Sequence, residues 1–179
     1  MKSLFTGLLL SVAVAAAPAG AVTAAPAGAG EIKRIGNTPQ ANILTGAIVP
    51  MGAEVFHLSG QLASPIDATK PPTGVESFGD TKTQTVSIFN KIKTILAAQG
   101  YAMSDIFKMT VFVTAAPGMD GKMDFAGFNA GYREFFGTAE NPNKVARSTV
   151  QVAGLAGTYF LIEIEVTAAK VGPMMHKAM

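Results

Sequence analysis

The chain contains no cysteine among its 179 residues. This absence excludes disulfide bonds, thiolate nucleophiles and cysteine-ligated metal sites. Stability must therefore come from an apolar core and from any contacts between subunits. The length suits one domain with a sizeable core and is too short for two ordinary domains.

Histidine is also scarce. The two histidines, His57 and His176, lie far apart in the sequence, and neither has Asp or Glu nearby at the spacing of a metal motif. His57 alternates with Phe56 and Leu58, which is typical of a packed or sheet-facing histidine rather than a catalyst. The sequence therefore predicts no bound metal.

Positive and negative charges are nearly equal in number. The chain has 14 basic and 12 acidic residues, for a formal charge of +2. No basic stripe is present that would hold a phosphate backbone. We therefore expect no nucleic-acid partner.

The N-terminus has the pattern of a signal peptide. Lys2 precedes an apolar run over 4–17, and the small residues Ala19-Gly20-Ala21 follow. A membrane anchor is the alternative, but the run is shorter than the roughly 20 apolar residues that span a bilayer. We predict cleavage after residue 21 and export to the periplasm or the medium, with no membrane attachment afterwards.

The remaining chain divides into three parts. Residues 22–30 are rich in Ala, Pro and Gly and are predicted to be a flexible linker. The ordered domain is expected over 31–170, and a flexible tail over 171–179.

Hydrophobic periodicity predicts the elements of this domain. Strands are expected at 31–35, 42–49, 54–62, 106–114, 146–152 and 159–166, and helices at 81–99 and 123–136. Asp80 or Thr81 would cap the first helix. This order favours an α+β fold with both helices on one face of a mixed sheet.

The second helix carries an aromatic stripe that the spacing places in the core. Phe125, Phe128 and Tyr132 belong to it. Gly127 and Gly131, four residues apart, suggest close packing of this helix on the sheet.

The last two strands carry the residues that suggest chemistry. Gly154 and Gly157 are expected to form the turn that makes these strands neighbours. In 159–166 and just beyond, the period of two places Ile162, Ile164 and Val166 on one face, and Leu161, Glu163, Glu165 and Thr167 on the other.

Arg147 and Glu163 would then form a small anion site. A guanidinium can donate two parallel hydrogen bonds to one carboxylate, and a glutamate can hold or activate water. The alternative is a cross-strand ion pair on a solvated face, which is common and usually inert.

Several stretches, in this order, give the chain a family resemblance. They are Leu58-Ser59-Gly60-Gln61-Leu62, Lys108-Met109-Thr110-Val111-Phe112-Val113, Phe125 to Phe136, Ala146-Arg147-Ser148-Thr149-Val150 and Ile162-Glu163-Ile164-Glu165. Together they resemble the RidA/YjgF/YER057c/UK114 family, also called the endoribonuclease L-PSP family, over residues 31 to 170. That family consists of small trimeric imine and enamine deaminases.

The resemblance implies a chorismate-mutase-like fold and a homotrimer with clefts between subunits. It also implies hydrolysis of short 2-imino or 2-enamino acids to 2-keto acids and ammonia. Arg147 would hold the substrate carboxylate and Glu163 would position water, while Ser59, Gly60 and Asn129 would line the cleft. No cofactor is implied, because an imine is already activated toward attack.

The chain departs from the family in two places. The region 41–46 lacks the tyrosine that lines the family's site. The spacing from Arg147 to Glu163 is one residue longer than the commonest one, so Glu165 is the second candidate for the water-positioning carboxylate. The alternative function is a non-catalytic exported trimer that binds a small carboxylate metabolite or acts as a chaperone-like protein.

Overall fold

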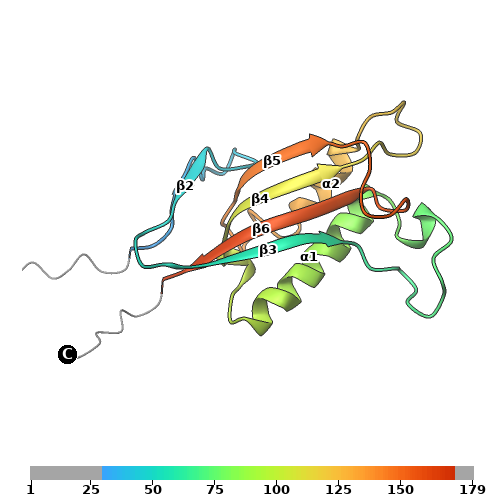
Figure 1. The fold of residues 1–179 in the computed structure, drawn as a ribbon. Helices are drawn as coiled ribbons and strands as arrows, with labels where there is room; N and C mark the ends of the chain where they lie inside the picture. Colours follow the sequence, from blue (N-terminus) through green and yellow to red (C-terminus); the bar gives the residue numbers. More distant parts are fainter. Residues whose placement is uncertain (1–29, 172–179) are drawn as a thin grey trace, which may run out of the picture.

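The structure, a computed structural model, describes residues 30–171 (Figure 1). The predicted signal peptide lies outside the described residues. The same holds for all of the predicted linker except Gly30 and for all of the predicted tail except Val171.

The centre of the fold is a four-stranded mixed sheet. Its strands are β3 (Glu54–Leu62), β4 (Ile106–Val113), β5 (Ala146–Gln151) and β6 (Ile162–Lys170), in the spatial order β3-β6-β4-β5. β4 pairs parallel with β5 and antiparallel with β6, and β3 pairs antiparallel with β6. The sheet is therefore mixed, as predicted.

The prediction that the last two strands are neighbours was wrong. β4 lies between β5 and β6. Neighbouring strands are about 4.8 Å apart, so the segment 152–161 easily spans one intervening strand. β4 takes the position inside the sheet because its alternate residues Met109, Val111 and Val113 are fully buried.

A separate two-stranded sheet precedes this core. β1 (Lys33–Ile35) pairs antiparallel with β2 (Gly46–Ile48). β2 is shorter than predicted because Leu44 N donates to Val145 O at 3.0 Å, which ties the start of the expected strand to another segment. Arg34 fixes this sheet to the core by donating to three main-chain oxygens, those of Ser104, Ile106 and Lys144.

The first helix has the predicted position. α1 (Thr81–Ala98) begins after Asp80, whose Oδ1 accepts from Thr83 N at 2.8 Å, and it ends two residues before Gly100, which has a φ of 75°. Short 3-10 helices occur at η1 (Val75–Ser77) and η2 (Met103–Asp105). None of the helices within residues 30–171 is long and apolar enough to cross a membrane.

The second helix is shorter than predicted. α2 (Phe125–Tyr132) begins after Asp124, whose Oδ1 accepts from Gly127 N at 2.7 Å. The residues that follow form turns, although Phe136 is still buried.

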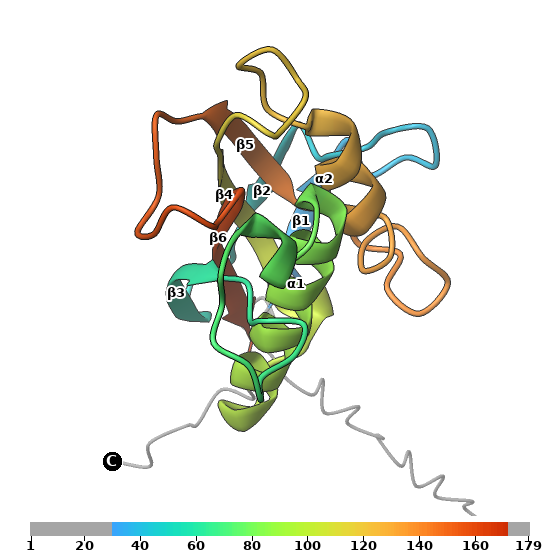
Figure 2. The ribbon, with the colours of Figure 1, turned by 90° about the vertical axis from the view of Figure 1, so that its right-hand side faces the viewer.

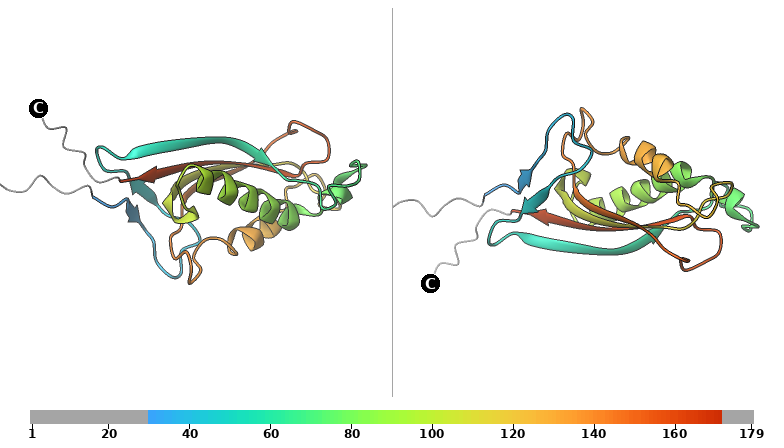
Figure 3. Two further views of the ribbon diagram at one scale, coloured as in Figure 1. Left: turned by 90° about the horizontal axis from the view of Figure 1, so that it is seen from below. Right: turned by 90° about the horizontal axis from the view of Figure 1, so that it is seen from above.

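Both helices cover one face of the sheet, as predicted (Figures 2 and 3). The core lies between the two layers and includes Ile88, Phe89, Ile92, Leu96, Met109, Val111, Phe128, Tyr132, Ile162 and Ile164. We call the other side of the sheet the open face. No element of the described chain covers it (Figure 3).

Two packing predictions were wrong. Phe125 is 46% exposed, because it occupies the first turn of α2 at the rim of the core. Gly131 packs against α1 rather than the sheet: a Cβ on it would lie 2.8 Å from Thr85 Cγ2. Leu161 lies just before β6 rather than inside it; it is buried, and its N–H donates to Gln84 Oε1 at 2.9 Å.

Candidate functional site

Arg147 lies on the helix side of the sheet. It is paired in register with Met109, a core residue, and paired residues of neighbouring strands point to the same face. Its guanidinium Cζ lies 4.6 Å from the ring centroid of Phe128, 4.7 Å from that of Tyr132 and 5.8 Å from that of Phe125. The cation is therefore held against the aromatic side of α2.

Asn129 lies on α2 beside the same guanidinium. Its Oδ1 accepts a hydrogen bond from Arg147 Nη2 at 2.8 Å, while its Nδ2 donates to Phe125 O at 2.8 Å. The amide is thus fixed by its own helix and orients the arginine. We call Arg147, Asn129 and the three rings the Arg147 half-site.

The guanidinium lacks a counter-charge. Burial lowers the pKa of Arg147, an effect opposed by Tyr132 and reinforced by Arg133. Within residues 30–171 the ion pairs are Lys70–Asp67 and Lys82–Glu134, so Arg147 pairs with no carboxylate there. Its Nη1 is buried and has no hydrogen-bond partner among the described residues.

The alternative of an inert ion pair between Arg147 and Glu163 or Glu165 was therefore wrong. Leaving a buried donor without an acceptor costs about 1 to 3 kcal/mol, and the cost is higher when the donor is charged. An anion placed against Arg147 would remove that penalty, so the half-site has the electrostatics of an anion receptor.

Glu163 lies on the open face. It is paired with Leu62 of β3 and with Phe112 of β4. Its carboxylate lies over the main chain of Gly60, where a Cβ would be only 1.8 Å from Oε1. A residue without a side chain is required there for Glu163 to adopt this position.

Ser59 and Gly60 form an irregularity in β3. The register with β6 shifts between Leu58 and Gln61, and Gln61 Nε2 donates to Ser59 O at 3.0 Å. Such a bulge turns local side chains away from the regular pleat. We call Gly60 and Glu163 the Glu163 half-site. Ser59 lines a hollow together with Glu165.

The predicted site residues therefore fall into two groups on opposite sides of the sheet. The structure brings Arg147 together with Asn129, and Glu163 together with Gly60. It does not bring Arg147 and Glu163 together in one chain, since β4 separates their strands and their side chains leave opposite faces.

Glu165 and His57 also lie on the open face. They line a hollow of about 240 Å³ together with Lys108, Thr110 and Thr167. His57 Nδ1 lies 3.4 Å from Thr167 Oγ1. His57 is therefore a sheet-facing residue, which agrees with the sequence-based interpretation.

The aromatic surroundings of Arg147 were not foreseen. Phe128 and Tyr132 were interpreted as core residues, and both are buried, but their rings also face the guanidinium. The signal was present in the order Phe128-Asn129-Tyr132, which places two rings and an amide on adjoining faces of one helix.

Within residues 30–171 no group of three or more metal-ligating side chains occurs.

Comparison with known proteins assigns the family. The family model described as Endoribonuclease L-PSP matches residues 47–170, well over half of the chain. A RutC family protein of Pyrococcus horikoshii is 40% identical over 113 residues, covering 63% of this chain and 77% of the relative. The 2-iminobutanoate/2-iminopropanoate deaminase of Salmonella typhimurium is 38% identical over 122 residues, covering 68% of this chain and 84% of the relative.

Solved structures give the same result. The crystal structure of Escherichia coli TdcF with bound serine matches with a TM-score of 0.50 at 30% identity, covering 77% of this chain and 99% of that one. A Rid family protein of Yersinia pestis matches in fold with a TM-score of 0.56 at 22% identity, covering 72% of this chain and 87% of that one. The chain therefore belongs to the RidA/YjgF family, which the Endoribonuclease L-PSP model describes.

Proposed function

We propose that this protein hydrolyses short 2-imino acids, and their 2-enamino tautomers, to 2-keto acids and ammonia. The observation that carries the proposal is the uncompensated guanidinium of Arg147, which offers unpaired donors to a substrate carboxylate. The similarity to a 2-iminobutanoate/2-iminopropanoate deaminase supports the same reaction class. The serine in the Escherichia coli relative is a small amino acid with the same carboxylate group.

The proposed chemistry needs only water and an acid–base group. Arg147 holds the carboxylate, and Asn129 orients the arginine. Glu163 takes a proton from water as its oxygen adds to the C=N carbon and passes that proton to nitrogen, which gives a carbinolamine; it then takes the proton of the new hydroxyl and passes it to nitrogen as the C=O bond forms and the C–N bond breaks. The products are the keto acid and ammonia. Glu165 remains the second candidate for this role, and Ser59 and Gly60 line the Glu163 side.

We further propose that the protein works as a homotrimer. Arg147 and Glu163 leave opposite faces of the sheet, so one site needs Arg147 from one subunit and Glu163 from its neighbour. The open face also bears exposed Val55 and Val150 at 41% and 43%, which contact between subunits would cover. Light scattering should give about three times the monomer mass.

The reaction is tested by ammonia release from freshly generated 2-iminopropanoate and 2-iminobutanoate. Wild type should exceed the buffer rate, whereas Arg147→Ala should not. Arg147→Lys should recover little, because an ammonium does not reproduce two parallel hydrogen bonds to one carboxylate. A wild-type rate equal to the buffer control would refute the deaminase proposal for these substrates.

A mixing experiment tests the shared site. Arg147→Ala and Glu163→Gln subunits should each be inactive alone. In a refolded equimolar mixture, an intact arginine should lie beside an intact glutamate at about one site in four, which is one half times one half. The mixture should therefore recover roughly a quarter of the wild-type rate. No recovery, in a mixture shown to exchange subunits, would contradict a site shared between subunits.

A second candidate function is binding without turnover. One observation favours it: within one chain Arg147 is held by Asn129 and keeps an unpaired Nη1, whereas Glu163 lies on the opposite face of the sheet. Titration of pyruvate into wild type and Arg147→Ala separates the functions. Binding by the wild type alone, without ammonia release, would identify a carboxylate-binding protein or a chaperone-like trimer.

We also propose that the protein is exported. The support is the sequence pattern of Lys2, the apolar run and Ala19-Gly20-Ala21. Mass spectrometry of the protein from its native host should find an N-terminus near Val22. An intact Met1 on a cytoplasmic protein would refute export.

A further inference from the structure

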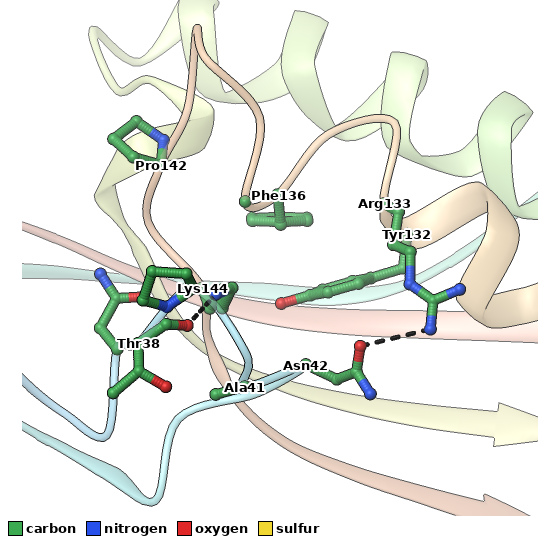
Figure 4. A pocket seen from close by; sticks show the side chains of 11 residues that line it. Thr38, Ala41, Asn42, Tyr132, Arg133, Phe136, Pro142 and Lys144 are labelled. Atoms are coloured by element: carbon green, nitrogen blue, oxygen red, sulfur yellow. Dashed lines mark hydrogen bonds between the residues drawn. The ribbon is translucent and has the colours of Figure 1, made fainter.

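A second pocket lies beside α2, away from the open face. It has a volume of about 500 Å³ and is formed by the segment 37–42, the end of α2 and the segment 142–144 (Figure 4). Its polar lining includes Lys144, Arg133, Asn42, Thr38 and the edge of Tyr132. We call it the Lys144 pocket.

The charge in this pocket has one sign. Lys144 and Arg133 both line it, and none of its described lining residues is acidic. Neither cation belongs to an ion pair within residues 30–171. The guanidinium of Arg34 is a third cation next to this pocket, because it donates to the main-chain oxygen of Lys144 at 3.0 Å.

Lys144 is the unusual member of the set. Its side chain is only 9% exposed, whereas lysines are almost never buried without a partner. Its Nζ donates to the main-chain oxygen of Thr38, a neutral acceptor (Figure 4). Burying an ammonium beside a neutral oxygen leaves much of its desolvation uncompensated.

Both cations keep donors for a ligand. An ammonium has three N–H donors, and one of those of Lys144 is used. A guanidinium has five, and Arg133 uses one, from Nη2 to Asn42 Oδ1 at 3.2 Å. In Figure 4 Tyr132 lies between the two side chains, with its hydroxyl turned toward Lys144.

We propose that the Lys144 pocket binds the oxyanion group of a small metabolite, either a carboxylate or a phosphate. The ligand would supply the negative charge that the described lining lacks, and Lys144 and Arg133 would contact it from two sides. This site is separate from the Arg147 half-site, because Arg147 does not line the pocket and the ring of Tyr132 stands between.

The proposal is tested by calorimetric titration of the full chain with inorganic phosphate and, separately, with succinate. The variants are Lys144→Met, which keeps the apolar stem, and Arg133→Gln, an exposed position where folding is not at risk. Lys93→Met is the matched control, since it removes the same charge from an exposed position of α1 outside the pocket. Arg147→Ala controls for binding at the other half-site.

Wild type, Lys93→Met and Arg147→Ala should bind at least one of the two anions. When made in the Arg147→Ala protein, so that the other half-site does not contribute, Lys144→Met and Arg133→Gln should bind it about ten- to a hundredfold more weakly, the range expected when one charge-assisted hydrogen bond is lost. Stronger binding of phosphate than of succinate would identify a phosphorylated ligand, and the reverse a carboxylate. If Lys144→Met does not fold, Arg133→Gln decides alone.

Three results would overturn the proposal. The first is no saturable binding of either anion by the wild type. The second is equal binding by the Arg147→Ala protein with and without Arg133→Gln. The third is loss of binding in Arg147→Ala with retention in Lys144→Met, which would assign the anion to the Arg147 half-site instead.

Discussion

Because Glu163 lies over Gly60, the addition of one methyl group in Gly60→Ala directly tests the role of the Glu163 carboxylate. In Gly60→Ala, the new Cβ would lie 1.8 Å from Oε1 and 2.7 Å from Cδ of Glu163. Ordinary contact begins near 3.4 Å, so the carboxylate oxygen must withdraw by about 1.6 Å. The atoms that must move are the end of a flexible side chain rather than main chain.

The effect on stability should therefore be small. The φ of Gly60 lies outside the left-handed range, so alanine fits its main chain and stiffens the unfolded chain, a gain of about 0.4 to 1 kcal/mol. A displaced Glu163 rotamer would offset this by about 0.5 to 1.5 kcal/mol. We expect the free energy of unfolding in urea to change by less than about 1 kcal/mol.

The effect on catalysis should be large. Misplacement of a catalytic group by about 1 Å can lower a rate by about a hundredfold, equivalent to about 2.7 kcal/mol of activation free energy. Ammonia release by Gly60→Ala should therefore fall by about that factor in kcat/KM. Pyruvate binding should persist, since Arg147 is untouched.

Gly154→Ala is the matched control, because a Cβ there would meet nothing within 4 Å. It should retain both activity and stability. A Gly60→Ala enzyme with kcat/KM within about threefold of wild type would refute the role of Glu163 in this position, and would direct attention to Glu165.

Three stability predictions follow from other contacts. Asp80→Ala should lower the unfolding free energy by about 1 kcal/mol at pH 7. Hydrogen bonds, the strongest of them from Thr83 N, hold the pKa of Asp80 below its usual value. The contribution of Asp80 is therefore present above about pH 4 and is lost as the pH falls through the folded-state pKa. In a urea series from pH 7 to 3 the difference from wild type should vanish, and a constant difference would contradict this reasoning. Gln84→Leu removes the acceptor of the buried Leu161 N–H and should lower stability by about 1 to 3 kcal/mol or more, whereas an unchanged denaturation midpoint would exclude that role for the contact. Gly131→Ala places a Cβ 2.8 Å from the stiff, buried Thr85 and should lower stability by about 1 to 3 kcal/mol. An increase in Tm would refute this prediction.

Local patterns predicted the elements better than they predicted their neighbours. The bounds of β3, the start of α1 after Asp80 and its end before Gly100 agree with the sequence, because capping and period are properties of nearby residues. Which strands pair depends on the whole sheet. A glycine-containing segment between 151 and 162 fits a hairpin as well as a crossing over β4, so the sequence alone did not separate the two.

For the candidate site, too, the sequence predicted the individual residues better than their arrangement in space. Arg147 and Glu163 were singled out by the strand pattern and by resemblance, and Asn129, Ser59 and Gly60 by resemblance alone. The period of two grouped Glu163 with Glu165 on one face of its strand, but it did not say which side of the sheet Arg147 faces. The face of Arg147 depends on its register with Met109, a residue nearly forty positions away. Its aromatic surroundings depend in turn on where α2 packs.

The separation of the two half-sites has a consequence for how activity depends on assembly. A cation held by Asn129 and three rings, and a carboxylate seated over a bulge, are each positioned by contacts within one chain. Neither half needs the other in order to form, so a monomer would retain carboxylate binding at Arg147 while losing turnover. In a trimer the carboxylate of the neighbour would approach an arginine that is already oriented, so association would mainly supply proximity between groups that are already positioned. Dilution below the trimer dissociation constant should therefore abolish ammonia release before it abolishes pyruvate binding, and simultaneous loss of both would show that the Arg147 half-site itself depends on the partner.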